Sequence, residues 1–159
     1  MSDRALLEEA IGLKEIVRAG WVRAGIGTPE SVADHSWGMA LLAIVLCPDD
    51  LDRERVLALA IVHDLAEVRV GDITPDEMPR DVKRERERIA AAGMLREHPT
   101  LWALWEDYEQ ARSREAKFVH ELDKLEMGLQ ALRYGAPEEF LESARAGITS
   151  ARLAALLER

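Results

Sequence analysis

The stretch IVHDLAEVRVGDITP, residues 61–75, places charged side chains inside an apolar segment. Its aliphatic residues predict a helix that packs away from water, yet His63, Asp64 and Glu67 interrupt it within about one helical turn. Burying an unpaired carboxylate costs on the order of several kcal/mol, a large part of the whole stability of a domain. A fold that buries this segment must therefore supply a partner that neutralises these groups.

The composition favours an all-α protein. The chain has 159 residues, which corresponds to about one domain with its own core. Ala, Leu, Glu and Arg dominate, aromatic residues make up only 5%, and strand patterns are nearly absent. We therefore expect residues 1–159 to form a single helical domain.

Charge and cysteine content limit the partners and the compartment. The net charge of −9 disfavours a nucleic-acid polymer or an anionic membrane as partner, whereas a small anionic substrate needs only a local group of cations. The single cysteine, Cys47, excludes an internal disulfide and fits a core position in a reducing compartment. The N-terminus lacks the apolar run of a signal peptide, and no segment approaches the roughly 20 apolar residues of a membrane span. We expect a soluble cytoplasmic protein.

Helical spacing and capping residues divide the chain into helices. Thr28 and Pro29 are expected to start the second helix as N-cap and first residue, Asp52 to cap the third, and Gly71 to end it. Residues 72–80 contain two prolines and are expected to form a loop. The helices are expected over residues 3–18, 28–47, 53–71, 83–97, 101–110 and 113–134, followed by two short helices separated by Gly147.

Four polar residues fall on the apolar faces of three of these helices. They are His35, His63, Asp64 and Asp123. Two imidazoles and two carboxylates form a suitable ligand set for a divalent metal such as Mn, Co, Fe or Zn. A bound cation would allow neutral histidine and ionised aspartate to be buried together, and it would leave coordination positions for water and substrate.

Three motifs in this order extend the pattern: SVADHSWGMA, VHDLAEVRVGDITP and ELDKLEMGLQA. Together they resemble the HD-domain metal-dependent phosphohydrolases, and more closely the branch of small 5′-deoxynucleotidases. The segment RAGWVRAGI is similar to the substrate-contacting stretch of that branch, so the resemblance covers about residues 13–135. It implies an HD-domain helical bundle with one metal held by the four residues above, and hydrolysis of deoxyribonucleoside 5′-monophosphates.

The resemblance also implies roles for further residues. Glu67 matches the glutamate of HDxxE and is expected to act as general acid or base, on the same helix face as His63. Asp72 would orient the attacking water. Trp21 would wall the sugar, although a core position is equally compatible with it. Arg18 and Arg23 flank this tryptophan and either would reach the phosphate; we favour Arg18.

The remaining histidines and tryptophans are assigned to structure. His120 lies three residues before Asp123, but we expect it on the surface, and a single metal follows. His98 is likewise not expected to be a ligand. Trp102 and Trp105 are assigned to packing or to a subunit contact.

Two other functions remain as alternatives. The first is an HD-fold hydrolase of another phosphate ester, a cyclic nucleotide or a nucleoside triphosphate; the lack of spare histidines and the short chain argue against it. The second is a noncatalytic nucleotide-binding module, which would not need Glu67 and Asp72. The family resemblance also implies a homodimer.

Overall fold

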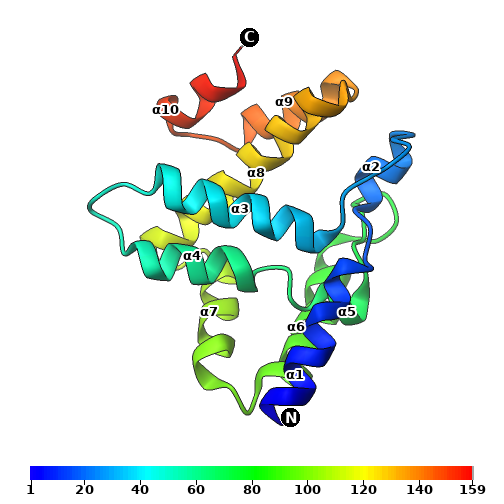
Figure 1. Cartoon of the computed structure of the whole chain (residues 1–159), viewed down its shortest axis with the longest axis vertical. Coiled ribbons are helices and arrows are strands. Elements are labelled where there is room, and N and C mark those ends of the chain that lie inside the picture. Colours follow the sequence, from blue (N-terminus) through cyan, green and yellow to red (C-terminus); the bar gives the residue numbers. More distant parts are fainter. Residues whose placement is uncertain (159) are drawn as a thin grey trace.

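The computed structural model describes residues 1–158, which are helical with short connections (Figure 1). Within this part of the chain the only β-type pairing is an isolated antiparallel bridge between Val17 and Ser31. The all-α prediction is therefore confirmed. The helices are α1 (Asp3–Ala10), the 3-10 helix η1 (Ile11–Lys14), α2 (Ala19–Arg23), α3 (Val32–Leu46), α4 (Arg53–Val62), α5 (Glu67–Val70), α6 (Arg80–Leu95), α7 (Pro99–Gln110), α8 (Arg114–Tyr134), α9 (Glu138–Ala146), α10 (Ala151–Ala154) and the 3-10 helix η2 (Ala155–Leu157).

The core lies where α3, α4 and α8 pack against one another (Figure 1). Met39 of α3, Leu59 of α4 and Leu122 of α8 are fully buried there. Burying each such side chain contributes about 1.5–3 kcal/mol, so this contact fixes how the three helices sit. These are also the helices, with the turn after α4, that carry the four polar residues singled out in the sequence.

Helix α8 agrees with the prediction at both ends. The Ser113 side chain accepts a hydrogen bond from the Ala116 amide, and Gly135 ends the helix with a φ of 63°. This left-handed conformation favours glycine, because it has no Cβ to clash. Asp123 lies near the middle of this rigid element.

The N-terminal helices differ from the prediction. The helix expected over residues 3–18 ends at Lys14, and the helix expected to start after Thr28 starts after Ser31, whose side chain forms a capping box with Asp34. The cause is a contact between the two linkers: the Arg18 amide donates to the Glu30 carbonyl at 3.0 Å. This pairing holds both linkers extended and leaves room only for the short helix α2 between them.

The predicted helix 53–71 is interrupted. Asp52 caps its start and Gly71, with a φ of 83°, ends it as expected. However, α4 ends at Val62, residues 63–66 form turns, and α5 starts at Glu67. In the turn the amide of residue 67 donates to the carbonyl of residue 64 at 2.9 Å, so the winding is tighter than in an α-helix. His63 and Glu67 therefore do not share one face of a continuous helix.

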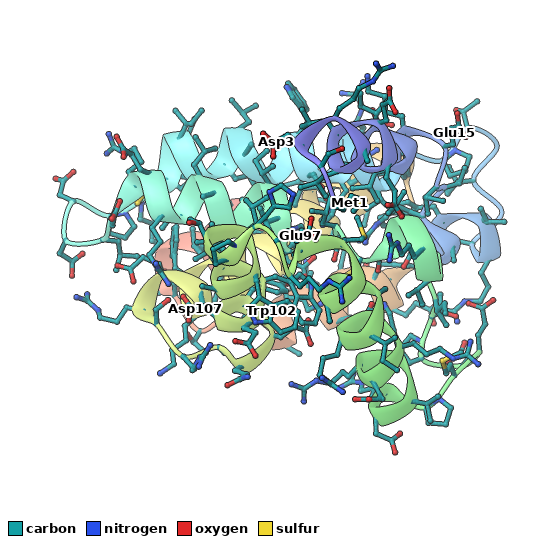
Figure 2. All side chains as sticks on the ribbon, turned by 90° about the horizontal axis from the view of Figure 1, so that it is seen from below. Met1, Asp3, Glu15, Glu97, Trp102 and Asp107 are labelled. Carbon is teal, nitrogen blue, oxygen red and sulfur yellow. The ribbon has the colours of Figure 1, made fainter. Side chains whose placement is uncertain are left out.

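The other elements follow the prediction more closely. The loop 72–79 precedes α6, and Pro99 is the first residue of α7. Cys47 is buried, as is Trp105, which stacks on Trp102 at 5.6 Å between ring centroids, in agreement with a packing role. Met1 and Glu97 lie together in Figure 2, where the terminal ammonium pairs with this carboxylate. Among the described residues, none of the helices combines the length and apolar character required to cross a membrane.

Candidate active site

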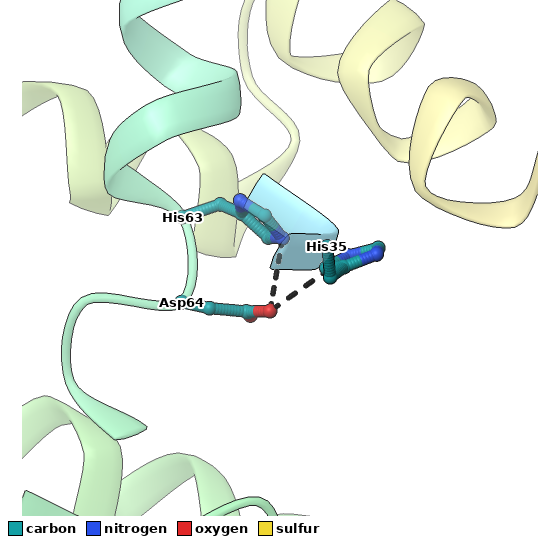
Figure 3. A group of neighbouring side chains, drawn as sticks. All are labelled: His35, His63 and Asp64. Atoms are coloured by element: carbon teal, nitrogen blue, oxygen red, sulfur yellow. Dashed lines mark ion pairs between the residues drawn. The ribbon is translucent and has the colours of Figure 1, made fainter. Parts of the chain in front are cut away.

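The structure brings the four predicted metal ligands together. His35 comes from α3, His63 and Asp64 from the turn that follows α4, and Asp123 from α8. Asp64 Oδ2 lies 3.0 Å from His63 Nε2 and 3.9 Å from His35 Nε2 (Figure 3). Asp123 Oδ1 lies 3.3 Å from His35 Nε2. Each of the two imidazoles thus directs its Nε2 atom toward the carboxylates.

Both Nε2 atoms are buried and, within residues 1–158, have no hydrogen-bond partner. Each imidazole uses its other nitrogen elsewhere: His63 Nδ1 lies 2.9 Å from the Ala60 carbonyl, and His35 Nδ1 lies 2.5 Å from Glu126 Oε2. A buried polar atom without a partner costs on the order of 1–3 kcal/mol. Two such nitrogens beside two carboxylates are the donor set that a divalent transition metal accepts, so these residues fit a metal site.

The charge states of these residues follow from the close approach of their imidazoles and carboxylates. Burial disfavours a charge on His35, but the Asp123 and Glu126 carboxylates outweigh it and raise the pKa of His35 to about 9. Burial also opposes ionisation of Asp64, yet the two imidazoles hold the pKa of this carboxyl well below its usual range. A proton on His35 therefore offsets part of the negative charge of the group when no cation is bound, and a metal must displace that proton.

Glu67 and Asp72 lie beside this group. Glu67 is only 3% exposed; its Oε1 lies 3.2 Å from Lys83 Nζ, and its Oε2 is buried without a partner among the described residues. Burial first, and then the Asp64 and Asp72 charges, raise the pKa of Glu67 well above its usual value. Asp72 Oδ2 accepts a hydrogen bond from the Ala19 amide at 2.8 Å, which ties the loop after α5 to the start of α2.

The three residues expected to bind substrate occupy different settings. Arg18 is largely buried, and its guanidinium lies 3.8 Å from Asp64 Oδ2. Burial disfavours the Arg18 cation, but the nearby carboxylates, first that of Asp64, outweigh it and raise its pKa. Arg23 is half exposed and pairs with Asp76 instead. Trp21 is only 2% exposed, so it is a core residue that also borders the site.

The cavity above this group has a volume of about 550 Å³, within the range of small-molecule sites. Its walls come from α2, the loop after α5, and α6 to α9. Of the residues predicted from the sequence, His35 and His63 are the two that do not border it, and both are buried. The predicted residues that line the cavity are Arg18, Trp21, Arg23, Asp64, Glu67, Asp72 and Asp123.

A model of the HD domain family matches residues 11–156. The chain belongs to the HD domain family. The 5′-deoxynucleotidase HDDC2 of Homo sapiens is 45% identical to it over 128 residues, which are 77% of this chain and 63% of that protein. The chain thus spans less than two thirds of the length of this relative.

Solved structures support the same HD-domain fold. The PH0347 protein from Pyrococcus horikoshii OT3 superposes with a TM-score of 0.83 at 34% identity, covering 96% of this chain and 92% of the other. A "predicted metal-dependent phosphohydrolase" from Magnetospirillum magnetotacticum MS-1 reaches a TM-score of 0.77 at 27% identity, with coverage of 97% and 88%. The resemblance inferred from the three motifs is confirmed by these comparisons.

One residue of the HD domain was placed wrongly. His120 was expected on the surface, but it is partly buried and borders the cavity. Its ring stacks on Tyr108 at 4.0 Å between centroids, and its Nε2 lies 2.8 Å from the Tyr108 carbonyl. The aromatic partner on α7 explains the burial. His120 precedes Asp123 by three residues on α8, so their common helix face was a usable signal.

Two further residues of the site were missed. Lys83 was not among the residues predicted for the site, yet it contacts Glu67 and Glu87 inside the cavity. Its alternating-charge surroundings in the sequence gave no signal for this role. Glu126 follows Asp123 by three residues, so helical spacing places the two on one side of α8. That signal could have identified it as a neighbour of the metal ligands.

Proposed function

We propose that this HD domain hydrolyses deoxyribonucleoside 5′-monophosphates to a deoxynucleoside and phosphate. The observation that carries the proposal is the convergence of two unpartnered imidazole nitrogens and two carboxylates beside a cavity that also holds a largely buried arginine and a buried glutamate. The 45% identity with a protein named 5′-deoxynucleotidase supports the choice of substrate class.

His35, His63, Asp64 and Asp123 would hold one divalent ion, namely Mn, Co, Fe or Zn. When bound there, such an ion supplies Lewis acidity toward a phosphoryl oxygen and makes a water more acidic. The unpartnered Nε2 atoms and the low pKa of Asp64 support this assignment, because the nitrogens face the carboxylates and Asp64 is presented in the ionised form that metals bind.

Arg18 is the residue that binds the phosphate in this proposal. Its guanidinium faces Asp64 from within the cavity, whereas Arg23 is engaged with Asp76 at the half-exposed edge. An arginine beside the transferred group stabilises the charge that develops on the phosphoryl oxygens. Trp21 closes the same wall, stacked on Phe140 at 4.6 Å, and would limit the space around the sugar.

Glu67 is the general acid. Its raised pKa favours the protonated form that a general acid needs, and its Oε2 has no other partner among the described residues. As water oxygen bonds to phosphorus and the bond from phosphorus to the 5′-oxygen breaks, Glu67 gives its proton to that leaving oxygen. Asp72, fixed through the Ala19 amide, accepts a hydrogen bond from the attacking water and orients it.

A phosphate-release assay tests this function. The substrates are dAMP, dGMP, dCMP and TMP with their ribose counterparts, each with Mn²⁺, Co²⁺, Fe²⁺ or Zn²⁺; cyclic nucleotides and deoxynucleoside triphosphates complete the series. We expect release from the deoxynucleoside monophosphates and less from the ribose forms. Faster turnover of a cyclic nucleotide or triphosphate would replace the proposal with the other hydrolase, and no turnover of any substrate would indicate a binding module.

The partner is proposed to be a second copy of the chain. Support comes from α3, where Trp37, Leu41, Ile44 and Val45 form an exposed apolar row and Trp37 is 69% exposed. Exposed apolar residues that gather on one helix face, unlike those scattered singly, are typical of a contact surface. Light scattering should give the mass of a dimer for the native chain and of a monomer for Leu41→Glu. The control is Ile89→Glu, at an exposed isoleucine of α6; a monomeric native chain would refute the dimer.

A further inference from the structure

Glu126 of α8 is a buried carboxylate that the mechanism above does not use. It is 8% exposed, and its Oε2 lies 2.5 Å from His35 Nδ1. Since it follows Asp123 by three residues, α8 presents one carboxylate to each nitrogen of the same imidazole: Asp123 faces Nε2 and Glu126 faces Nδ1. A buried carboxylate is costly to retain, so its position behind a metal-binding histidine requires an explanation.

The chemistry of imidazole supplies one. A neutral imidazole carries one proton, and the nitrogen without it is the one that can bind a metal. A carboxylate beside Nδ1 keeps the proton on Nδ1 and leaves the lone pair of Nε2 directed at Asp64 and Asp123. His63 is oriented in the same sense by the Ala60 carbonyl, which is a weaker, uncharged acceptor.

The packing around Glu126 leaves space for this arrangement. A Cβ added to Gly38 of α3 would lie 2.6 Å from Glu126 Oε1, closer than atoms can approach. Gly38 lies inside a helix of 15 residues, where glycine costs roughly 0.5–1 kcal/mol relative to alanine. The absence of a side chain at this position therefore gives the carboxylate room against α3, one turn from His35.

A second carboxylate lies in the same region. Glu30, His35 and Glu126 each contribute an atom to a group that lies within 4.8 Å. Glu30, however, accepts a hydrogen bond from Trp21 Nε1 at 2.8 Å. Glu126 is thus the acceptor in contact with His35, and Glu30 serves the wall of the cavity.

We propose that Glu126 is a positioning residue, which fixes the tautomer and the orientation of His35 and thereby strengthens metal binding. This inference rests on the metal site of the proposed function but not on its substrate. Carboxylates that orient metal-ligating histidines typically change metal affinity by about 10–100-fold when they are removed. Glu126→Ala should therefore weaken metal binding by roughly that factor, whereas Glu126→Gln, which keeps an acceptor oxygen, should weaken it less.

The test is a titration of the metal-free full chain with Co²⁺, followed by calorimetry and by the visible absorption of the bound ion. The matched control is Glu121→Gln, which changes a carboxylate of α8 that binds Thr149 and Ser150 instead. Melting of each variant in chelator separates a loss of fold from a loss of affinity. If Glu126→Ala binds Co²⁺ within about twofold of the native chain and of the control, the proposal is overturned.

Gly38→Ala provides a second, independent variant. It should favour helix α3 while displacing the carboxylate, so the metal-free protein stays folded and Co²⁺ affinity falls. In the Glu126→Ala background the same substitution should have no further effect on affinity, because the group it displaces is gone. An equal loss in both backgrounds would refute the link. None of these measurements uses a nucleotide. A chain that binds Co²⁺ as expected but releases no phosphate would therefore refute the proposed function and leave the role of Glu126 standing.

Discussion

Lys83 Nζ on α6 lies 3.2 Å from Glu67 Oε1, at the first residue of α5. This contact joins two helices that both border the cavity, and it satisfies one oxygen of a carboxylate that is otherwise buried. Burial opposes the Lys83 cation, but Glu67 and Glu87 outweigh it and raise its pKa, so the lysine stays charged. The general acid of the proposed mechanism is therefore held beside a permanent positive charge.

Lys83→Met should shift the pH profile of turnover. The Lys83 charge lowers the pKa of Glu67, so its loss raises that pKa further and extends the protonated acid to higher pH. The alkaline limb of the profile of kcat/KM against pH should therefore move to higher pH. Arg88→Met, which removes an exposed partner of Glu85, is the control. An unchanged alkaline limb in Lys83→Met would contradict the assignment of Glu67 as acid.

Glu67→Gln and Glu67→Ala should each lower turnover by about 100-fold or more, the usual contribution of general acid catalysis. Metal content should stay at the native level, because Glu67 is not one of the four proposed ligands. Steady-state kinetics and metal analysis of the same preparations check both points. Native activity in either variant would leave a nucleotide-binding module as the better description.

Glu67 should also make the stability of the metal-free protein depend on pH. Its folded-state pKa lies well above the ordinary value of 4.5. Between these two values the folded chain holds a proton that the unfolded chain has released, so the free energy of unfolding falls as pH rises. Urea unfolding at several pH values should show a steeper fall for the native chain than for Glu67→Gln. Parallel curves would show that the buried carboxyl does not have a raised pKa.

Asp123→Ala should remove metal binding and metal-dependent stability together. A ligand at 100 times its Kd stabilises a folded protein by about 2.7 kcal/mol. We expect chelator to lower the melting temperature of the native chain and of the surface control Asp81→Ala, but not that of Asp123→Ala. A native melting temperature that does not respond to chelator, with full activity, would exclude the metal.

Arg18→Ala and Arg23→Ala should differ. Loss of a hydrogen bond from a charged group costs about 1.5–3 kcal/mol, so Arg18→Ala should lower kcat/KM by roughly 10–100-fold. Arg23 pairs with Asp76 at the half-exposed edge, and its removal should change kcat/KM by no more than about threefold. The reverse order would assign the phosphate to Arg23.

The features predicted correctly from the sequence are those with local causes. Ser113 and Gly135 bound α8 as expected because a side-chain cap and a left-handed glycine act within a few residues. The family was recognisable because its motifs place His35, His63, Asp64 and Asp123 in a fixed order. That these four bind metal, and that residues 1–159 form one domain, stay predictions.

The features that were missed depend on contacts distant in sequence. Thr28 carried the same local signal as Ser31, and the pairing of residues 16–18 with residues 30–32 decided between them. The break at His63 could not be predicted because residues 63–66 contain no glycine or proline, the residues that most strongly end a helix. Lys83 contacts Glu67 from sixteen residues away in the sequence, and no spacing rule connects the two.

The hydrogen bond from the Ala19 amide to Asp72 divides the loop after α5 into an anchored part and a tip. Its first residues are anchored to the segment that carries Arg18, while the Thr74 amide and hydroxyl donate hydrogen bonds to Glu77, and the same hydroxyl accepts one from Arg23. Exchanging Pro75 and Asp76 at the tip would therefore leave the Asp72 anchor and the Thr74–Glu77 turn in place, and would remove only the half-exposed pair with Arg23. Because both residues border the cavity, grafting other side chains at this tip offers a route to altered base selectivity that leaves the proposed metal ligands untouched.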